Sequence, residues 1–172
     1  LSTGGVECWG ANGDGQLGDG TTIECLSFPF PCSPKPKAVI GLSSGVVAVS
    51  AGYGYSCALL VSGSVKCWGN NNGTPIAVGG LSSGVIAVSV GGGHACAILS
   101  NGGVKCWGNN GFGQLGDGTT TNRSSPVQVG NLTSGVVSVT AGEYHTCALM
   151  DSDNVKCWGW NDYGQLGDGT GT

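Results

Sequence analysis

Residues 85–107 read VIAVSVGGGHACAILSNGGVKCW, and close copies of this segment stand at residues 46–68 and 136–158. The copies begin 39 and 51 residues apart. The string CWG, with which each copy continues into the next residue, occurs once more at residues 8–10. One unit of about 50 residues is therefore repeated along the chain, with length changes between constant positions. Repeats of this length are typical of propellers and solenoids.

Four short strands are expected in each unit. Runs of Val, Ile, Ala and Ser alternate with turns rich in Gly, Ser and Asn, and no helical period is present. Four short strands per repeat are the pattern of a propeller blade. The expected first strands are 46–51, 85–90 and 136–141, the second 55–61, 94–99 and 145–150, the third 65–68, 104–107 and 155–158, and the fourth 37–39, 76–78 and 127–129.

The predicted fold class is all-β, with propeller blades of four antiparallel strands. The blades would hold two, four, four and three strands, which is 13 in all. A closed ring needs at least four complete blades, so we expect an incomplete arc of about three and a half blades, completed by a longer polypeptide or by other chains. The expected division of this single propeller segment, 1–172, is a partial blade 1–42, blades 43–81 and 82–132, and a partial blade 133–172.

The length changes fall in one connection, after the third strand of each unit. The connection reads NGDGQLGDGTT after Trp9 and NGFGQLGDGTT after Trp107, whereas after Trp68 this part is absent and the connection is twelve residues shorter than after Trp107. Its Gly, Asn, Asp and Thr residues predict a surface loop, where insertions and deletions cost little.

Nine cysteines are present, and six of them recur ten residues apart on either side of an expected hairpin turn. Opposed residues of an antiparallel pair bring Cβ atoms into disulfide range, although buried reduced thiols are the alternative. Cys8 is left unpaired, and by the repeat its partner would precede Leu1. The predicted pairs are Cys57–Cys67, Cys96–Cys106 and Cys147–Cys157 across hairpins, and Cys25–Cys32 in the long first connection.

Charge and hydropathy exclude several function classes. Ten acidic against six basic residues give a net charge of −4, which excludes a basic nucleic-acid footprint. No run of apolar residues is long enough for a membrane-spanning helix. A hydrophobic content of 40% excludes a charge-driven disordered chain.

The strings GQLGDGTT (15–22), GLSSGVVAVSAG (41–52), GEYHTCAL (142–149) and VKCWG (155–159) resemble the regulator of chromosome condensation repeat. The resemblance covers nearly the whole chain and implies a propeller, typically of seven blades. The form with CALL and VKCWG is similar to versions in secreted or surface proteins of bacteria. Paired cysteines favour an oxidising compartment. We therefore expect an extracellular, secreted or cell-surface protein.

Proteins of the family that this chain resembles have several different activities. The family includes a nuclear exchange factor for a small GTPase, but a nuclear protein is not expected to carry paired hairpin cysteines. It includes a plant UV-B photoreceptor that uses Trp and Arg, which the matching segments GYGYS (52–56), GGGHA (91–95) and GEYHT (142–146) lack. It also includes a secreted bacterial β-lactamase inhibitor that binds its target with one face, which fits the expected compartment.

Three kinds of motif are candidates for catalytic or metal sites. GLSSG at 41–45 and again at 80–84 matches a nucleophile pattern, but it stands in a turn before a strand and not in the strand–turn–helix context that the chemistry requires. We read it as a turn. His94 and His145 share one repeat position with Tyr55, which favours packed side chains bonded to backbone over metal ligands.

The Asp-containing loops 12–20, 110–118 and 161–169 lack the spacing of a calcium loop, and turn capping is the favoured interpretation. We predict no catalytic, metal or cofactor residue, no cofactor and no enzyme activity.

Candidate contact residues lie outside the repeat pattern. Phe28 and Phe30 stand between two cysteines and several prolines, which is typical of a pre-organised contact loop, with coverage of a blade edge as the alternative. Trp160 does not recur and is expected to be exposed, whereas the tryptophans of the CWG strings are expected to pack between blades. Asn72, Asn122 and Asn131 begin glycosylation sequons in or beside loops.

These features predict a non-enzymatic extracellular propeller that binds a protein or a surface polymer. One alternative is a self-assembling structural subunit of a surface filament or sheath. Another is a secreted enzyme inhibitor that uses one propeller face. No nucleic-acid partner is expected.

Overall fold

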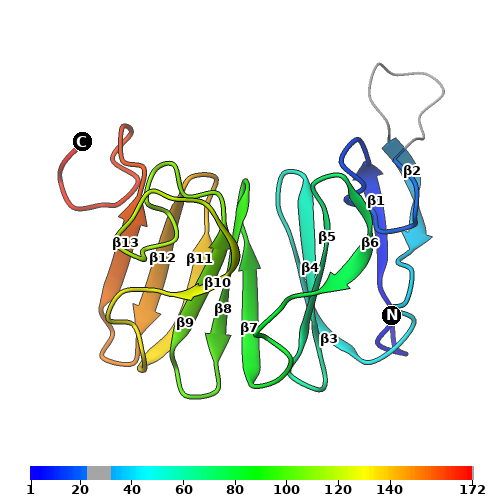
Figure 1. Ribbon diagram of the computed structural model, residues 1–172, viewed down its shortest axis with the longest axis horizontal. Helices are drawn as coiled ribbons and strands as arrows, with labels where there is room; N and C mark the ends of the chain where they lie inside the picture. The colour runs from blue at the N-terminus through cyan, green and yellow to red at the C-terminus, as the bar shows by residue number, and fades with distance from the viewer. Residues whose placement is uncertain (23–31, 172) are drawn as a thin grey trace.

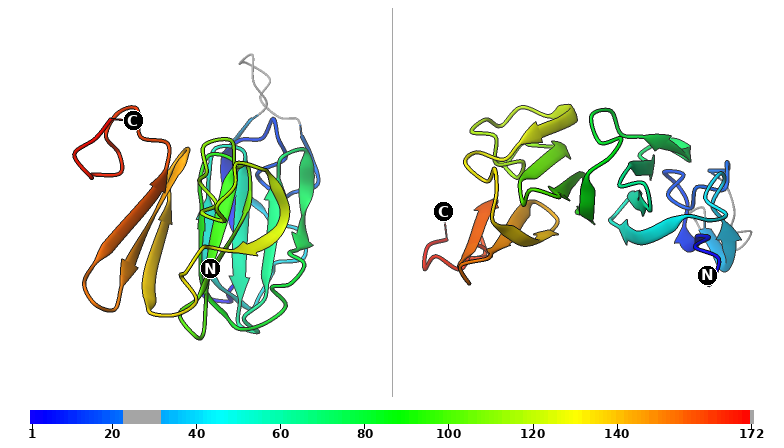
Figure 2. Two further views of the ribbon diagram at one scale, coloured as in Figure 1. Left: turned by 60° about the vertical axis from the view of Figure 1, so that its left-hand side comes forward. Right: turned by 90° about the horizontal axis from the view of Figure 1, so that it is seen from below.

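The computed structural model describes residues 1–22 and 32–171, and within these ranges it contains thirteen strands and no helix. The strands form four antiparallel sheets of two, four, four and three strands, arranged side by side along an arc (Figures 1 and 2). The first sheet is β1 (Glu7–Ala11) and β2 (Cys32–Ala38). The second is β3 (Val46–Ala51), β4 (Tyr55–Leu60), β5 (Val65–Gly69) and β6 (Asn72–Ala77). The third is β7 (Val85–Val90), β8 (His94–Leu99), β9 (Val104–Gly108) and β10 (Arg123–Gln128). The fourth is β11 (Val136–Ala141), β12 (His145–Met150) and β13 (Val155–Gly159). The predicted fold class and strand counts are confirmed.

The fourth strands differ from the prediction, because β2, β6 and β10 begin earlier than expected and end before Val39, Val78 and Val129. These valines lie beyond the strand ends, in turns where Val78 N–H donates to the Val65 carbonyl and Val129 N–H to the Val104 carbonyl, each at 3.0 Å. The strands themselves are polar, contain proline and lie at the edge of their sheets, which is where proline is tolerated. Val39, Val78 and Val129 thus mark the turns after the edge strands, whereas Ile76 and Val127 lie within them.

The three cross-hairpin disulfides are present. In the third sheet, Cys96 on β8 stands directly opposite Cys106 on β9, with Cα atoms 4.1 Å apart, and neither side chain is exposed. The same register holds in the second and fourth sheets. The bonded pairs are Cys57–Cys67, Cys96–Cys106 and Cys147–Cys157.

Neighbouring sheets pack closely through their first strands. The Ser50 hydroxyl accepts the Val90 N–H, and the Ser89 hydroxyl accepts the Ala141 N–H, each at 2.9 Å. A side chain at Gly52 would overlap the carbonyl oxygen of Gly91, so only glycine allows this approach. The hydrophobic core therefore consists of separate layers between sheets, made of small Ala, Cys and Val side chains and a few large ones. No helix in the described part of the chain could cross a membrane.

Candidate functional site

One edge of the four sheets carries the turns between first and second strands and the connections that follow the third strands, and we call this edge the loop face (Figure 1). Backbone hydrogen bonds join the two kinds of loop. Asn109 N–H donates to the Gly93 carbonyl at 2.9 Å, and Trp160 N–H donates to the Tyr144 carbonyl at 2.9 Å. The two kinds of loop on the loop face are therefore bonded to each other.

The long connections are rigid because a buried asparagine organises each of them. The Asn110 side-chain oxygen accepts the Leu115 N–H at 2.9 Å, and its amide nitrogen donates to the Asp117 carboxylate at 3.1 Å and to the Thr119 carbonyl at 3.0 Å. Asn12 and Asn161 make the corresponding bonds in their loops. The same side-chain amide therefore organises all three loops.

The loop aspartates cap turns. The Asp117 carboxylate accepts the hydroxyl of Thr119 at 2.7 Å and the Nε–H of Arg123 at 2.8 Å. The Thr119 hydroxyl bond, with a further contribution from Arg123, lowers the pKa of Asp117 to about 2. In the described residues, no group of three or more His, Cys, Asp or Glu side chains could hold a metal ion.

Two of the long connections, those after β1 and β9, also cap a tryptophan of the next sheet. The Gln16 carbonyl accepts the Trp68 indole N–H at 2.8 Å, and the Gln114 carbonyl accepts that of Trp158 at 2.9 Å. Gly116 lies so close to Trp158 that an added Cβ would stand 2.7 Å from the indole nitrogen. A loop from one blade thus covers the tryptophan of the next blade.

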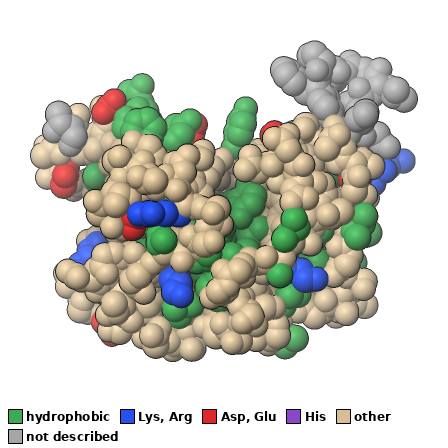
Figure 3. Space-filling view, viewed as in Figure 1, with side chains coloured by type: hydrophobic (Ala, Val, Ile, Leu, Met, Phe, Trp, Pro, Cys, Tyr) green, Lys and Arg blue, Asp and Glu red, His purple; other side chains and the backbone are tan. Residues whose placement is uncertain are grey.

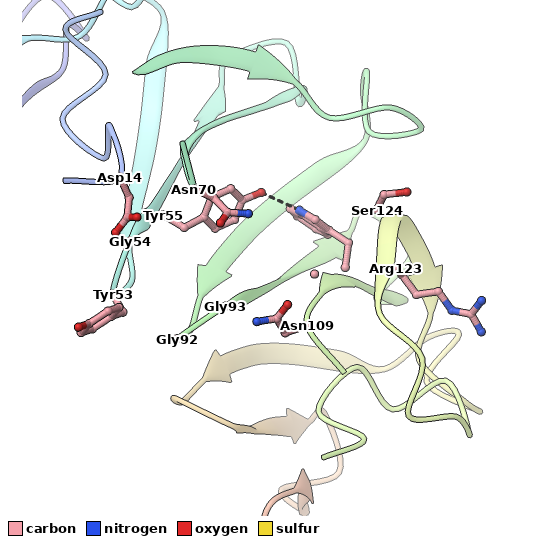
Figure 4. A pocket seen from close by; sticks show the side chains of 12 residues that line it. Asp14, Tyr53, Gly54, Tyr55, Asn70, Gly92, Gly93, Asn109, Arg123 and Ser124 are labelled. Carbon is pink, nitrogen blue, oxygen red and sulfur yellow. Dashed lines mark hydrogen bonds between the residues drawn. The ribbon is translucent and has the colours of Figure 1, made fainter. Parts of the chain in front are cut away.

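The connection between β5 and β6 breaks this pattern. It consists of Asn70 and Asn71, both with positive φ (53° and 70°), and so no loop reaches Trp107 of the third sheet. Instead, the indole N–H of Trp107 donates to the hydroxyl oxygen of Tyr55 at 2.9 Å (Figure 4). Burial raises the pKa of the Tyr55 phenol. Tyr55 therefore takes over part of the role of the absent loop.

His94 occupies the position of Tyr55 one blade further on. It is fully buried, and its Nε2 lies 2.8 Å from the Thr146 hydroxyl. Burial, with a smaller contribution from the charge of His145, lowers the pKa of His94 to about 4. The side chain is packed as expected, but its partner is a hydroxyl of the next blade and not backbone, because the adjacent blade presents Thr146 to it.

Four aromatic side chains meet on the loop face, and we call them the aromatic cluster: Phe112, Tyr144, Trp160 and Tyr163. Their ring centroids lie 5.1 to 5.7 Å apart in four contacts, and Tyr163 is 83% exposed. Figure 3 shows hydrophobic side chains that project from the loop face above the β11–β13 end of the molecule. The rings form one accessible apolar surface.

The sequence singled out only Trp160 of this cluster. The other three come from the connection after β9, the β11–β12 turn and the connection after β13. The signal that could have found them is departure from the repeat, since Phe112 and Tyr163 stand where the first connection has Asp14.

A cleft of about 470 Å³ lies over the boundary of the second and third sheets (Figure 4). Tyr53, 87% exposed, and Tyr55 line one side, and Asn109 and Arg123 line another. Gly92 and Gly93 also line it; the neighbouring blades carry Tyr53 and Glu143 in place of Gly92. The cleft is the space next to the short β5–β6 connection.

Comparison with known proteins identifies the repeat. A family model of the Regulator of chromosome condensation (RCC1) repeat matches residues 3–59 and 101–149, and a second model of the same repeat matches 46–73, 85–114 and 136–165. The chain belongs to this family. Its predicted membership is confirmed, together with the cysteine-paired form of the repeat.

The RCC1-repeat chain is similar to parts of much larger curated proteins. It is 34% identical over 161 residues to human "Probable E3 ubiquitin-protein ligase HERC3", covering 92% of this chain and 11% of that protein. It is 33% identical over 163 residues to rat "Probable E3 ubiquitin-protein ligase HERC4", covering 94% of this chain and 11% of that protein. The chain thus spans about a tenth of the length of these relatives.

Two solved structures share the fold of this chain. Yeast RCC1 (Prp20), solved with Kap60, is 25% identical with a TM-score of 0.78, and the match covers 96% of this chain and 42% of that one. Human WBSCR16 is 24% identical with a TM-score of 0.76, and the match covers 92% and 43% of the two chains. The blades of this chain are therefore arranged as in those structures.

The GLSSG segments of this RCC1-repeat chain are turns. The segment at 41–45 leads into β3 and the one at 80–84 into β7, and their leucines, Leu42 and Leu81, are buried at 1% exposure. A nucleophile elbow needs a helix after the turn, which neither segment has.

The remaining candidate residues lie in different places. Cys25, Phe28 and Phe30 fall outside the described residues, so the loop disulfide and the contact loop stay predictions. Cys8 is half-buried without a disulfide partner among the described residues, and burial raises the pKa of its thiol. Trp9 differs from the expected packing, with 64% exposed surface, because no connection caps it in the described structure.

Proposed function

We propose that this RCC1-repeat chain is a non-enzymatic, extracellular module that binds a protein partner through its loop face, with the aromatic cluster at the centre of the contact. The cluster carries the proposal. Tyr and Trp dominate the energetics of protein interfaces when they are grouped and supported. Rings that already pack on one another lose little freedom on binding.

The surroundings of the cluster favour a partner with basic side chains. Glu143 lies beside Tyr144 and raises the pKa of its phenol through a hydrogen bond, and Asp162 is exposed next to Tyr163. The net charge of the chain is −4. Acidic groups around an apolar contact select basic partners and increase the association rate.

The extracellular location and the protein-binding role have separate support. Three hairpin disulfides are typical of proteins that fold in an oxidising compartment. Protein binding agrees with yeast Prp20, which is bound to Kap60 in one solved structure and binds Gsp1p and histones. The ligase activity in the names of the HERC relatives belongs to proteins that this chain matches over only about a tenth of their length, and we do not propose it for this chain.

The test is affinity capture from the extracellular fraction of the source organism, followed by a measured Kd for the captured protein. Trp160→Ala combined with Tyr163→Ala is expected to weaken binding about 30-fold or more, since removal of a hot-spot residue costs roughly 2 kcal/mol. The matched control is Val61→Ala, because Val61 is 77% exposed in the β4–β5 turn at the opposite edge. Equal binding by wild type and the double variant would refute the aromatic contact.

Self-association is the second candidate, because large apolar side chains are exposed on the first and fourth sheets. Trp9 is 64% exposed on β1, and Val155 is 65% exposed on β13. A head-to-tail contact between two such surfaces generates a filament or a ring. Sedimentation over a hundredfold range of concentration tests it, and a monomer throughout would eliminate it. A secreted enzyme as the captured partner would identify the chain as an inhibitor.

A further inference from the structure

Basic and acidic side chains occupy different parts of this fold. All six lysine and arginine residues lie within third or fourth strands: Lys35 and Lys37 on β2, Lys66 on β5, Lys105 on β9, Arg123 on β10 and Lys156 on β13. Arg123 lines the cleft, but its guanidinium is bonded to Asp117 and points away from Tyr55 in Figure 4. The turns and connections of the loop face therefore contain acidic residues and no lysine or arginine.

The acidic side chains of the loop face are of two kinds. Asp19, Asp117 and Asp168 each accept the hydroxyl of a threonine two residues later, at 2.7 Å, and so cap turns. Glu143 and Asp162 are exposed, and within the described residues neither is paired with a lysine or arginine. Figure 3 shows acidic side chains beside the hydrophobic ones above the β11–β13 end. This part of the loop face is therefore both aromatic and negatively charged.

The side chain of Glu143 has a defined place on this surface. Tyr53, Gly92 and Glu143 hold the same repeat position in three successive blades, so Gly92 lies between the other two. An added Cβ at Gly92 would stand 2.9 Å from Cγ of Glu143, so glycine leaves room for the Glu143 side chain. The phenol of Tyr144 donates to the Glu143 carboxylate, and this hydrogen bond raises the pKa of Tyr144, with a smaller contribution from Tyr53. The carboxylate is therefore held beside Tyr144, at the side of the aromatic cluster that faces Tyr53.

The neighbouring aromatic rings determine which cation suits this carboxylate. Tyr144 contacts Trp160 with 5.7 Å between the ring centroids, and Tyr53 is 87% exposed on the other side of Gly92. A guanidinium group stacks on aromatic rings while its N–H groups donate to a carboxylate. A lysine ammonium group is more strongly hydrated and lacks this planar geometry. The combination of groups therefore favours arginine over lysine.

We propose that the loop face binds an arginine side chain of the partner protein at Glu143. The guanidinium pairs with the Glu143 carboxylate and stacks on the ring of Tyr144, and Tyr53 packs against the aliphatic part of the arginine. This inference rests on the proposed function, because it specifies which group of the partner lies beside the aromatic cluster. Trp160 and Tyr163 then contact the residues next to that arginine.

The probe is a blocked tripeptide with arginine between two glycines, and matched tripeptides carry lysine or citrulline, the neutral analogue of arginine. Binding to the full 172-residue chain is followed through the indole N–H resonance of Trp160, assigned by its loss in Trp160→Phe. The indole N–H of Trp68, bonded to the Gln16 carbonyl, is the internal reference. We expect a saturable shift with arginine at millimolar concentration, binding about threefold weaker with lysine, and no shift with citrulline. No shift at tens of millimolar arginine peptide, or equal binding of the lysine peptide, would overturn the proposal.

Two substitutions with the same change of net charge make the test specific. Glu143→Gln is expected to weaken binding of the arginine peptide about fivefold, because it removes the charge that pairs with the guanidinium. Asp153→Asn is the matched control and should leave binding unchanged, since Asp153 is exposed in the β12–β13 turn at the opposite edge. Its positive φ of 62° is one that asparagine adopts readily. Equal effects of the two substitutions would show attraction by net charge alone and would overturn the site.

Tyr53→Ala tests the aromatic part of the site. The side chain is exposed, so its removal leaves the fold intact, and binding of the arginine peptide is expected to weaken about twofold to threefold. The lysine peptide should lose less, because its ammonium gains less from the ring. The same proportional loss for both peptides would contradict the stacking of a guanidinium on this surface.

The arginine site and the proposed aromatic contact fail separately in the captured complex. A partner whose Kd rises with Trp160→Ala combined with Tyr163→Ala, but not with Glu143→Gln, would retain the aromatic contact and overturn the arginine site. A partner whose Kd rises with Glu143→Gln alone would retain the arginine site and refute the contact of Trp160 and Tyr163. A rise with both supports the two proposals together.

Discussion

Nε2 of His94 lies 2.8 Å from the hydroxyl oxygen of Thr146, and the same hydroxyl donates to the carbonyl of Gln114. His94 belongs to the third sheet and Thr146 to the fourth, and both side chains are fully buried. One hydroxyl group thus links two blades and the connection that covers them. Buried polar groups of this kind are costly when a partner is removed.

Thr146→Val is expected to lower the free energy of unfolding by about 1–3 kcal/mol, because His94 loses its hydrogen-bond partner in a buried site. Urea unfolding measures this change. Thr140→Val on β11 is the control, since Thr140 is exposed and its substitution should change stability by less than about 0.5 kcal/mol. Equal effects of the two substitutions would show that the hydroxyl link contributes nothing.

The stability of the fold should fall between pH 6.5 and pH 4 because of His94. Its pKa is about 4 in the folded chain against 6.5 for the free side chain, so the unfolded chain binds the proton first as the pH falls. The contribution is fully present above the unfolded pKa and is lost as the pH falls toward 4, by up to about 3 kcal/mol. Urea midpoints across this range should vary less in His94→Gln than in wild type. Parallel profiles would contradict the assignment.

Removal of one hairpin disulfide should destabilise the chain. Cys96→Ser combined with Cys106→Ser is expected to cost about 2–3 kcal/mol, as for a short closed loop, and thermal unfolding measures it. Cys8→Ser, at the cysteine without a partner in the described structure, should cost less than about 1 kcal/mol. An equal loss in the two variants would argue against a stabilising role of the hairpin bond.

Gly116 and Gly118 give a matched pair for the cap on Trp158. Both have positive φ (64° and 79°), but only Gly116 has a neighbour that an added Cβ would meet, the Trp158 indole at 2.7 Å. Gly118→Ala should cost about 1 kcal/mol from backbone strain alone, and Gly116→Ala about 1–3 kcal/mol more from overpacking. Unfolding followed by tryptophan fluorescence compares them. A similar loss of unfolding free energy in the two variants would mean that the loop does not pack tightly against the Trp158 indole.

Some inter-blade features could not be predicted from the sequence. The shortened connection after Trp68 was visible, but not that Tyr55 would replace the absent loop as partner of Trp107. The cluster of Phe112, Tyr144 and Trp160 could likewise not be predicted. Its members come from separate connections and meet only when the third and fourth sheets pack.

The sequence by itself determined the repeat, the strand order and the pairing of Cys57, Cys96 and Cys147 with the cysteines ten residues beyond them. Hairpin pairing depends on residues close in sequence, so the spacing alone carries it. The tertiary structure decided the partner of His94, the exposure of the aromatic cluster and the open cleft beside Trp107. These depend on how one blade lies against the next, and contacts between segments about 40 to 50 residues apart leave no periodic signal in the chain.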